Sequence, residues 1–186
     1  MTHKMKLESL PARSFYTIKG FANLYDNDLD ENVEKEDVWE TIRRHFSDGS
    51  VERLKKVAGS ENVYMLFCYT VERNNEKKCY VCSYDIACEK LSSENSSEFD
   101  IIKLEACEYV LYDCEFDDKT PLWDAHIPTD LLFWGDNGWL ANNPYVCAID
   151  ILENTGKGYA QLELYTPFDI DAKRFNMKIW YPVIPK

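Results

Sequence analysis

Residues 160–166, AQLELYT, and residues 176–183, NMKIWYPV, decide the fold of this 186-residue chain. Both segments are rich in the aliphatic and aromatic side chains that pack well in strands. Side chains alternate between the two faces of a strand, so Glu163 and Tyr165 point one way while the two leucines beside them point the other. The sequence therefore predicts a C-terminal strand on which a carboxylate shares a face with an aromatic ring.

A similar pattern occurs earlier in the chain. Four pairs of segments align in the same order: residues 10–15 with 104–109, 38–39 with 122–123, 65–69 with 161–165, and 80–82 with 178–180. A duplicated strand, helix, strand, strand unit is the simplest account of this repetition. We expect one domain over residues 1–186, with a first repeat at about 5–88, a polar linker at about 89–98 and a second repeat at about 99–186.

Each repeat alone would leave one face of its sheet uncovered, so we expect the two to pack about an approximate twofold axis. The seam between them is the natural place for a cavity. The expected fold class is α+β, with duplicated β-α-β-β units, pseudo-twofold symmetry and an antiparallel sheet whose helices pack on one side.

The remaining segments fit this plan. Apolar residues recur near helical spacing over residues 38–57, and Ser47-Asp48-Gly49-Ser50 divides that stretch into two predicted helices. The other expected strands lie at 15–18, 63–71 and 78–86, with a hairpin turn at Asn74-Asn75. We also expect a loop or helix lead-in at 26–37, a strand pair or long bent strand at 99–113, and a helix at about 121–133.

Composition narrows the class of partner. The chain is 45% hydrophobic and 29% charged, as in ordinary globular proteins, and its formal net charge is −12. A field of that sign disfavours direct contact with nucleic acid or an anionic membrane surface. Aromatic residues make up 14%, which fits either a lined pocket or a β-rich core. The sequence shows no export signal or apolar span, so we expect a cytoplasmic protein with its 7 cysteines as thiols.

The common catalytic and metal motifs are missing from the sequence. It has no G-x-S-x-G, no phosphate-binding or dinucleotide-binding glycine pattern and no H-E-x-x-H. Cys79 and Cys82 have C-x-x-C spacing, but they fall in a predicted strand, where residues three apart face opposite sides. The three histidines form no ligand pair. We therefore expect neither a metal nor a cofactor.

The C-terminal pattern, residues 162–165 followed by residues 179–183, resembles the GyrI-like small-molecule-binding domain. That family also forms the effector-binding part of AraC-type and MerR-type multidrug regulators. Its recurring ending is an acidic E-(I/L)-Y strand, and then a strand closing in an aromatic residue, an aliphatic residue and P-V. The resemblance implies the GyrI-like or SOUL-like effector-binding fold.

The resemblance extends over nearly the whole chain, through residues 10–12 and 104–109. Two features depart from the family pattern: an acidic insertion before Trp39 and a tryptophan-rich loop at 133–139. No helix-turn-helix segment precedes the domain in this sequence. We therefore expect a stand-alone member of the family rather than a transcription factor.

The resemblance also implies a binding site. In the family, ligands lie at the pseudo-dyad against the glutamate of the E-(I/L)-Y strand, which here is Glu163, and the aromatic residue of the closing strand is Trp180. The repeat alignment adds Phe67 and Tyr69 as counterparts of Glu163 and Tyr165 on the other wall. The further candidate ligand-binding residues are aromatic: Tyr109, Trp134 and Trp139.

For several of these residues, a role in packing or at the surface, without a ligand, stays open. Glu163 fits an exposed strand position on the strand pattern alone. Trp134 and Trp139 lie in Phe133-Trp134-Gly135-Asp136-Asn137-Gly138-Trp139, which resembles a lid with glycine hinges, yet either tryptophan could be a packing residue. Trp123, on a predicted helix, fits the core better than the site.

Three functional hypotheses follow. The first is a binding protein for amphipathic, aromatic or cationic compounds, with Glu163 as counter-charge and rings that add cation–π contact. The second is a hydrolase of cyclopropane-bearing genotoxins, in which Glu163 orients or deprotonates water. The third, on fold analogy alone, is a protein that shields gyrase from inhibitors. We expect a monomer or a weak dimer whose main partner is a small organic ligand.

Overall fold

The computed structural model describes residues 5–25, 38–67, 72–74, 79–93, 95–116, 131–148, 158–167 and 175–186. The chain divides into two compact units. The C-terminal unit comprises Met1–Arg13 and Lys103–Lys186, and the N-terminal unit comprises Ser14–Ile102. The first residues of the chain therefore belong to the same unit as its last residues.

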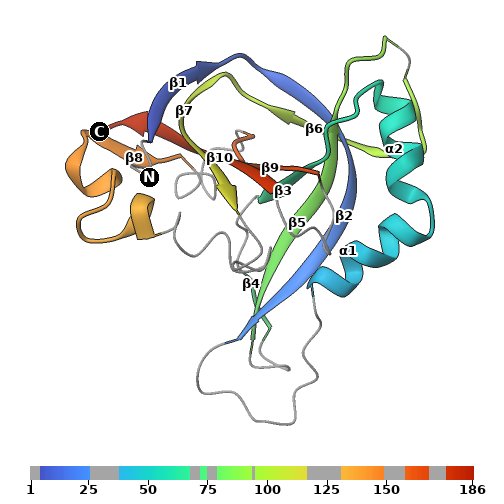
Figure 1. Cartoon of the computed structure of the whole chain (residues 1–186), viewed down its shortest axis with the longest axis horizontal. Coiled ribbons are helices and arrows are strands. Elements are labelled where there is room, and N and C mark those ends of the chain that lie inside the picture. Colours follow the sequence, from blue (N-terminus) through green and yellow to red (C-terminus); the bar gives the residue numbers. More distant parts are fainter. Residues whose placement is uncertain are drawn as a thin grey trace. The chain divides into compact units, whose positions relative to one another are not determined.

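The C-terminal unit is built on antiparallel strands in the order β1-β7-β10-β9, with β8 also pairing with β10 (Figure 1). Their bounds are Lys6–Leu10 for β1, Cys107–Phe116 for β7, Tyr145–Cys147 for β8, Gln161–Thr166 for β9 and Phe175–Pro185 for β10. Strand β10 is the centre of this sheet because it pairs with β7, β8 and β9. Within the C-terminal unit, the strand paired with β9 is β10.

The N-terminal unit contains strands in the order β3-β5-β2-β6, with β4 pairing with β5. Their bounds are Arg13–Tyr25 for β2, Tyr64–Phe67 for β3, Glu72–Asn74 for β4, Cys79–Glu89 for β5 and Asp100–Leu104 for β6. Strands β2 and β5 are long and curved in Figure 1, and they pair from Phe15 opposite Glu89 to Tyr25 opposite Cys79. This ladder is the backbone of the unit.

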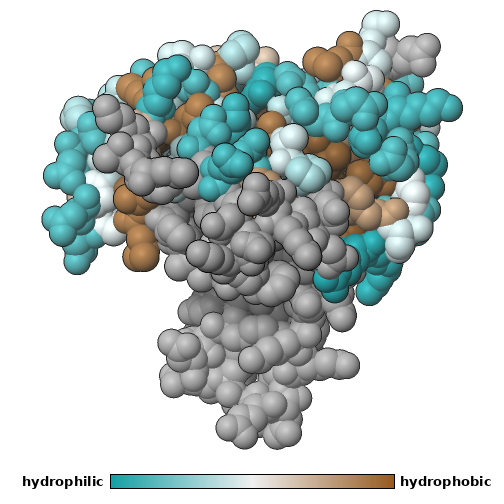
Figure 2. All heavy atoms as spheres, viewed as in Figure 1, coloured by the Kyte–Doolittle hydropathy of each residue, from teal (hydrophilic) through white to brown (hydrophobic). Residues whose placement is uncertain are grey.

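Two helices accompany the N-terminal unit, α1 over Val38–Ser47 and α2 over Ser50–Ala58. Gly49 has a φ of 76°, in the left-handed region that glycine adopts without strain, and it separates the helices as the sequence predicted. Helix α2 packs against β5 and buries Val51 and Leu54. On the face shown in Figure 2, hydrophilic side chains cover much of the surface over the two helices.

Several predicted elements are confirmed. The antiparallel sheet with few helices is present, and the chain breaks after Leu10 and after Leu104, as the aligned repeats require. Strands β4 and β5 pair antiparallel with Asn74 opposite Cys79, so Asn74 lies in a strand and not in the predicted turn, and Asn75 lies outside the described residues. The sequence did not predict β1 as a separate strand. The duplication, the pseudo-twofold axis and the single-domain organisation stay predictions.

Other predicted segments lie largely outside the described residues. These are the loop at 26–37, most of the helix at 121–133 and the second half of the strand at 63–71. A helical turn is present at residues 131–134, at the end of the helix predicted for residues 121–133. Among the described residues, no helix is both long and apolar enough to cross a membrane.

Candidate functional site

Strand β9 carries a buried polar cluster. Gln161, Glu163 and Tyr165 alternate along the strand and share one face, as the sequence predicted for the last two. Their exposed fractions are 2%, 4% and 4%. A glutamate on the water-facing side of a sheet would be mostly exposed, so the bland interpretation of Glu163 as a surface strand residue is wrong.

Hydrogen bonds hold both oxygens of the Glu163 carboxylate. The side-chain amide of Gln161 donates to Oε1 at 2.7 Å. The hydroxyl of Tyr165 donates to Oε2 at 2.6 Å. Hydrogen bonds to an ionised acceptor are short and stronger than those between neutral groups, and these distances fall in that range. The carboxylate is thus fixed in orientation by its own strand.

The neighbouring strand, β10, places apolar side chains beside this cluster. Ile179 of β10 lies directly opposite Glu163, and Met177 lies directly opposite Tyr165. Residues directly opposite each other in a ladder share a face, and both β10 residues are fully buried. We call the side of the β7, β10 and β9 strands that carries Glu163 the acid face. Tyr112 of β7, opposite Ile179, belongs to it as well.

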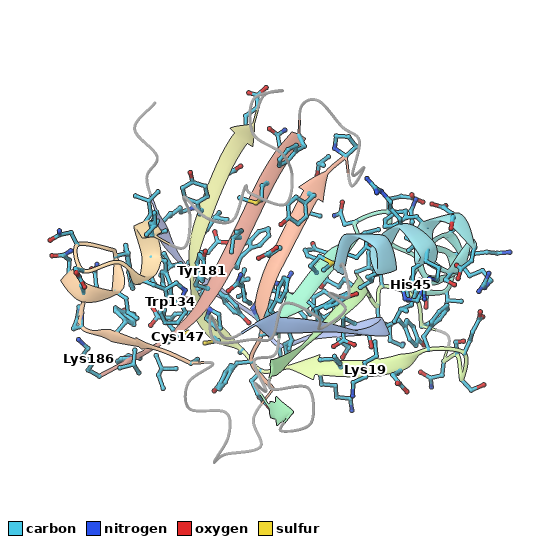
Figure 3. All side chains as sticks on the ribbon, turned by 90° about the horizontal axis from the view of Figure 1, so that it is seen from below. Lys19, His45, Trp134, Cys147, Tyr181 and Lys186 are labelled. Carbon is cyan, nitrogen blue, oxygen red and sulfur yellow. The ribbon has the colours of Figure 1, made fainter. Side chains whose placement is uncertain are left out.

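Tyr181 links the acid face to an aromatic cluster. It shares the face of Ile179, two residues earlier on β10. Its ring stacks on Phe133 with centroids 4.1 Å apart and planes at 9°. Trp134 stands perpendicular to Tyr181 at 6.4 Å, and Figure 3 shows these two side chains near each other. Phe133 and Trp134 thus pack residues 131–139 against Tyr181 of β10.

The cluster continues through Trp139 to Tyr145 of strand β8. Phe133 also stacks with Trp139 at 6.2 Å, and Trp139 meets Tyr145 at 5.4 Å. Phe133 and Tyr181 are fully buried, whereas Trp134 is 40% exposed. Trp134 and Trp139 therefore both take part in packing. Of the rings of Phe133, Tyr181 and Trp134, only that of Trp134 keeps a large exposed area.

The turn between the two tryptophans is closed by backbone hydrogen bonds. The Gly138 amide donates to the Gly135 carbonyl at 2.7 Å, and the Trp139 amide donates to the Leu132 carbonyl at 2.8 Å. A Cβ at Gly135 would approach the Leu131 carbonyl oxygen to 2.5 Å, and one at Gly138 would approach the Phe133 oxygen to 2.7 Å. The glycines are thus needed for close backbone packing, and their role as hinges of a lid stays a prediction.

The structure places two of the predicted site residues on the other side of the sheet. Trp180 lies directly opposite Leu162, so it faces away from Glu163, and its indole Nε1 donates to Glu8 Oε1 at 2.6 Å. Tyr109 pairs with Glu8 and with Pro182, which puts it on that same opposite face. Neither residue is brought to the acid face by this strand register.

The remaining candidates are distributed as follows. Phe67 ends β3 in the N-terminal unit, where its ring lies 6.4 Å from that of Tyr84. Tyr69 and Trp123 lie outside the described residues. Cys79 and Cys82 both fall within strand β5, as predicted.

Sequence reasoning missed Gln161, Tyr181 and Tyr112. The signal that finds Gln161 and Tyr181 is the same alternation that paired Glu163 with Tyr165, extended by one step along β9 and applied to β10. The family motif drew attention to Trp180 because that residue matches the aromatic position of the closing strand. Tyr112 needs the register of β7 against β10, which a single sequence does not contain.

Asp85 is the other buried acid among the described residues, with an exposed fraction of 6%. It lies on β5 in the N-terminal unit, directly opposite Lys19 of β2 and Leu66 of β3. Burial raises the pKa of its carboxyl to about 6, against the opposing effect of Lys19. Unlike Glu163, Asp85 has no hydrogen bond recorded in the described part of the chain.

Cysteine and metal chemistry have little support in the described residues. Burial raises the pKa of the Cys88 thiol to about 12, which keeps it protonated and unreactive near neutral pH. Cys88 and Cys107 are thiols, as expected. No group of three or more histidine, cysteine or acidic side chains in the described ranges is arranged to hold a metal ion.

Solved structures show the same fold. A structure of SAV2435 bound to tetraphenylphosphonium matches with a TM-score of 0.62 and 14% identity, over 97% of this chain and 94% of that one. A putative transcription regulation protein from Staphylococcus aureus matches with a TM-score of 0.59 and 15% identity, over 97% and 98% of the two chains. The EcmrR C-terminal domain matches with a TM-score of 0.55 and 11% identity, over all of both chains.

No protein-family profile matches the sequence, and no curated protein matches it significantly. At this low sequence identity, the similarity to the solved structures shows the fold alone.

Proposed function

We propose that this chain, whose fold fits a GyrI-like domain as its motifs predicted, binds small organic cations with Glu163 as the counter-charge. The observation that carries this proposal is the state of the Glu163 carboxylate. It is 4% exposed, it lies on a face with aromatic rings, and side chains of its own strand hold both of its oxygens. A carboxylate so arranged presents negative charge in a fixed place.

The physical reason is that burial strengthens attraction to a cation. Two unit charges interact several-fold more strongly near a protein interior than in bulk water, because the effective dielectric constant is lower. Keeping a buried carboxylate is costly, and hydrogen bonds such as those from Gln161 and Tyr165 offset part of that cost. Rings beside the site add cation–π attraction of about 0.5 to 2 kcal/mol. The tetraphenylphosphonium bound to SAV2435, a protein of similar fold, supports a ligand of this type.

The walls of the proposed site come first from the acid face. Tyr165 contacts the carboxylate directly, and Tyr181, on the same face, packs against the rings of Phe133 and Trp134. Because Glu163 is 4% exposed, a cation reaches it only when neighbouring side chains move aside. Trp139 stays in the proposal as a further ring contact, whereas Phe67 belongs to the N-terminal unit and Tyr69 lies outside the described residues. Trp180 and Tyr109 leave it because they face the other way.

Capture is favoured over hydrolysis by the solved structure of SAV2435, a protein of similar fold that is bound to tetraphenylphosphonium. A counter-charge needs a negative group in a fixed orientation, which the hydrogen bonds from Gln161 and Tyr165 provide. Ligand binding is therefore the function that we propose.

Titration with tetraphenylphosphonium tests the proposal. Glu163→Gln keeps the size and removes the charge, and we expect it to weaken binding at least about tenfold, equal to about 1.4 kcal/mol. Glu8→Gln is the matched control, because Glu8 is in the same unit but its carboxylate contacts Trp180 on the opposite face. We expect it to change the affinity less than about twofold. Calorimetry measures both, with circular dichroism to confirm folding.

Two results would overturn the proposal. One is equal affinity of the wild-type protein and a folded Glu163→Gln variant. The other is a loss of affinity in Glu8→Gln as large as that in Glu163→Gln, since this would point to the overall negative charge rather than to one carboxylate.

A further inference from the structure

Strand β1 lies at one end of the strand order in the C-terminal unit. It covers Lys6–Leu10, and β7 is the only strand with which it pairs in the part of the chain that the structure describes. Within those residues, the other edge of β1 therefore meets no strand. The N–H and C=O groups of such an edge can form a ladder with a strand of another chain. Strand β1 is thus a place where a second protein can add to the sheet.

The side chains of β1 fit such an addition. Leu7 is an exposed large hydrophobic residue. Lys6 and Glu8 lie on either side of it along the strand, and both point to the other face of the sheet. The Lys6 side chain is 73% exposed, and its ammonium lies 3.8 Å from Glu8 Oε2. Because the indole of Trp180 donates to Glu8 Oε1 at 2.6 Å, the negative charge beside Lys6 is held in place.

The order Lys6-Leu7-Glu8 is complementary to itself. A twofold axis perpendicular to the sheet places β1 antiparallel to the β1 of a second copy and keeps the side-chain faces the same. With the axis beside Leu7, the two leucines lie opposite each other, and each Lys6 lies opposite the Glu8 of the other copy. Opposite residues in an antiparallel ladder have Cβ atoms about 4.5 to 5.5 Å apart, which is close enough for their charges to pair. This register gives one apolar contact and two ion pairs.

Other registers of β1 against a second β1 are less favourable. An axis beside Lys6 or beside Glu8 places two like charges directly opposite each other, which is destabilising. An axis beside Ser9 or beside Leu10 leaves Lys6 beyond the end of the second strand. The charges of β1 therefore select the register that is centred on Leu7.

Strand β6, at the end of the strand order in the N-terminal unit, lacks this property. It covers Asp100–Leu104 and carries opposite charges at Asp100 and Lys103. These residues are three positions apart, so they point to opposite faces of the strand. A twofold axis perpendicular to the sheet cannot bring them opposite each other. The pattern of complementary charges thus belongs to β1 and not to β6.

We propose that the edge of β1 is the surface through which two copies of this protein form a weak dimer, with Leu7 at the twofold axis and two Lys6–Glu8 ion pairs between the copies. Strands of 5 residues bury less area than a stable dimer needs, so the association is weak. Two chains of net charge −12 repel each other, and the ion pairs set the orientation in which they meet. The inference is independent of the proposed function, because it uses neither Glu163 nor its neighbours on β9.

Two charge reversals test the register. Lys6→Glu and Glu8→Lys each turn both ion pairs into contacts between like charges, so each variant should associate at least about tenfold more weakly than the wild type. An equimolar mixture of the two variants restores both pairs, because one chain then offers two acids and the other offers two lysines. The mixture should associate about as tightly as the wild type. Sedimentation equilibrium at protein concentrations up to about 1 mM measures all four samples.

Further variants control for charge and folding. Lys103→Glu makes the same change of charge on β6, and it should change the association less than about twofold. Leu7→Lys puts like charges at the twofold axis and should weaken the association at least about tenfold. It keeps the test decisive if Glu8→Lys, which removes the acceptor of the Trp180 indole, fails to fold. Circular dichroism confirms the folding of each variant.

Several results would overturn the inference. Wild-type protein that stays monomeric over the whole concentration range has no such interface. A wild-type dimer that persists in folded Lys6→Glu and Leu7→Lys variants forms through another surface. A mixture of the two folded charge-reversed variants that stays monomeric, or a loss of association in Lys103→Glu as large as that in Lys6→Glu, would show that the Lys6–Glu8 pairs do not join the copies.

Discussion

Glu163 and Asp85, the buried acids among the described residues, differ in their hydrogen bonding. Glu163 receives hydrogen bonds on both oxygens from residues of its own strand. Asp85 lies between Lys19 and Leu66 in the ladder, and burial raises the pKa of its carboxyl to about 6 from an ordinary value of 3.8. Hydrogen-bonded donors stabilise a charged carboxylate, whereas burial without them favours the protonated form. The first acid is suited to hold a cation, and the second to hold a proton.

The raised pKa of Asp85 predicts a pH effect on stability. Since the folded state binds this proton more tightly than the unfolded state, raising the pH from about 4 to about 6 lowers the free energy of unfolding. The lost stability is about 2 kcal/mol and stays lost above that window. We expect Asp85→Asn to remove this dependence, so that its effect on stability is more favourable at pH 7.5 than at pH 4.5 by a similar amount.

Urea unfolding of both proteins at the two pH values measures this difference. Asp136→Asn, which changes an exposed aspartate of the C-terminal unit, is the control and should have the same effect at both pH values. An Asp85→Asn variant with equal effects at both pH values would show that Asp85 does not bind the proton.

At the scale of elements, Phe133 is the fully buried ring of the segment from Leu131 to Trp139 and makes its shortest ring contact with the sheet. Phe133 is fully buried and stacks on Tyr181 at 4.1 Å, whereas its neighbour Leu132 is 40% exposed. We expect Phe133→Ala to lower the free energy of unfolding by about 3 kcal/mol, because it leaves a cavity where the ring was. Leu132→Ala should cost less than about 1 kcal/mol. Urea denaturation compares the two, and equal losses would contradict this description of the packing.

Some of these elements could be predicted from a single sequence and others could not. The strands β9 and β10, the break at Gly49 and the face shared by Glu163 and Tyr165 follow from local pattern, and all were predicted. The side on which Trp180 lies follows from the same alternation, but the family motif outweighed it. The position of β1 beside β7 could not be predicted, because pairing between residues about a hundred positions apart depends on tertiary packing.

At the scale of the whole molecule, two sources of attraction for a cation must be separated. The net charge of −12 creates a diffuse field that concentrates cations near any part of the surface and is screened by salt. A buried carboxylate acts at one place and is screened much less. The similarity to solved structures supports the fold over nearly the whole chain. The fold does not by itself place a charge at one point, whereas the Glu163 carboxylate on the acid face does.

The position of a bound cation distinguishes these sources most directly. A crystal structure of the protein with tetraphenylphosphonium should show the phosphorus within roughly 6 Å of the Glu163 carboxylate, with rings of the ligand against aromatic side chains of the acid face. Glu163 should still accept hydrogen bonds from Gln161 and Tyr165. A cation bound elsewhere on the protein, with the Glu163 cluster closed as it is here, would contradict the central claim.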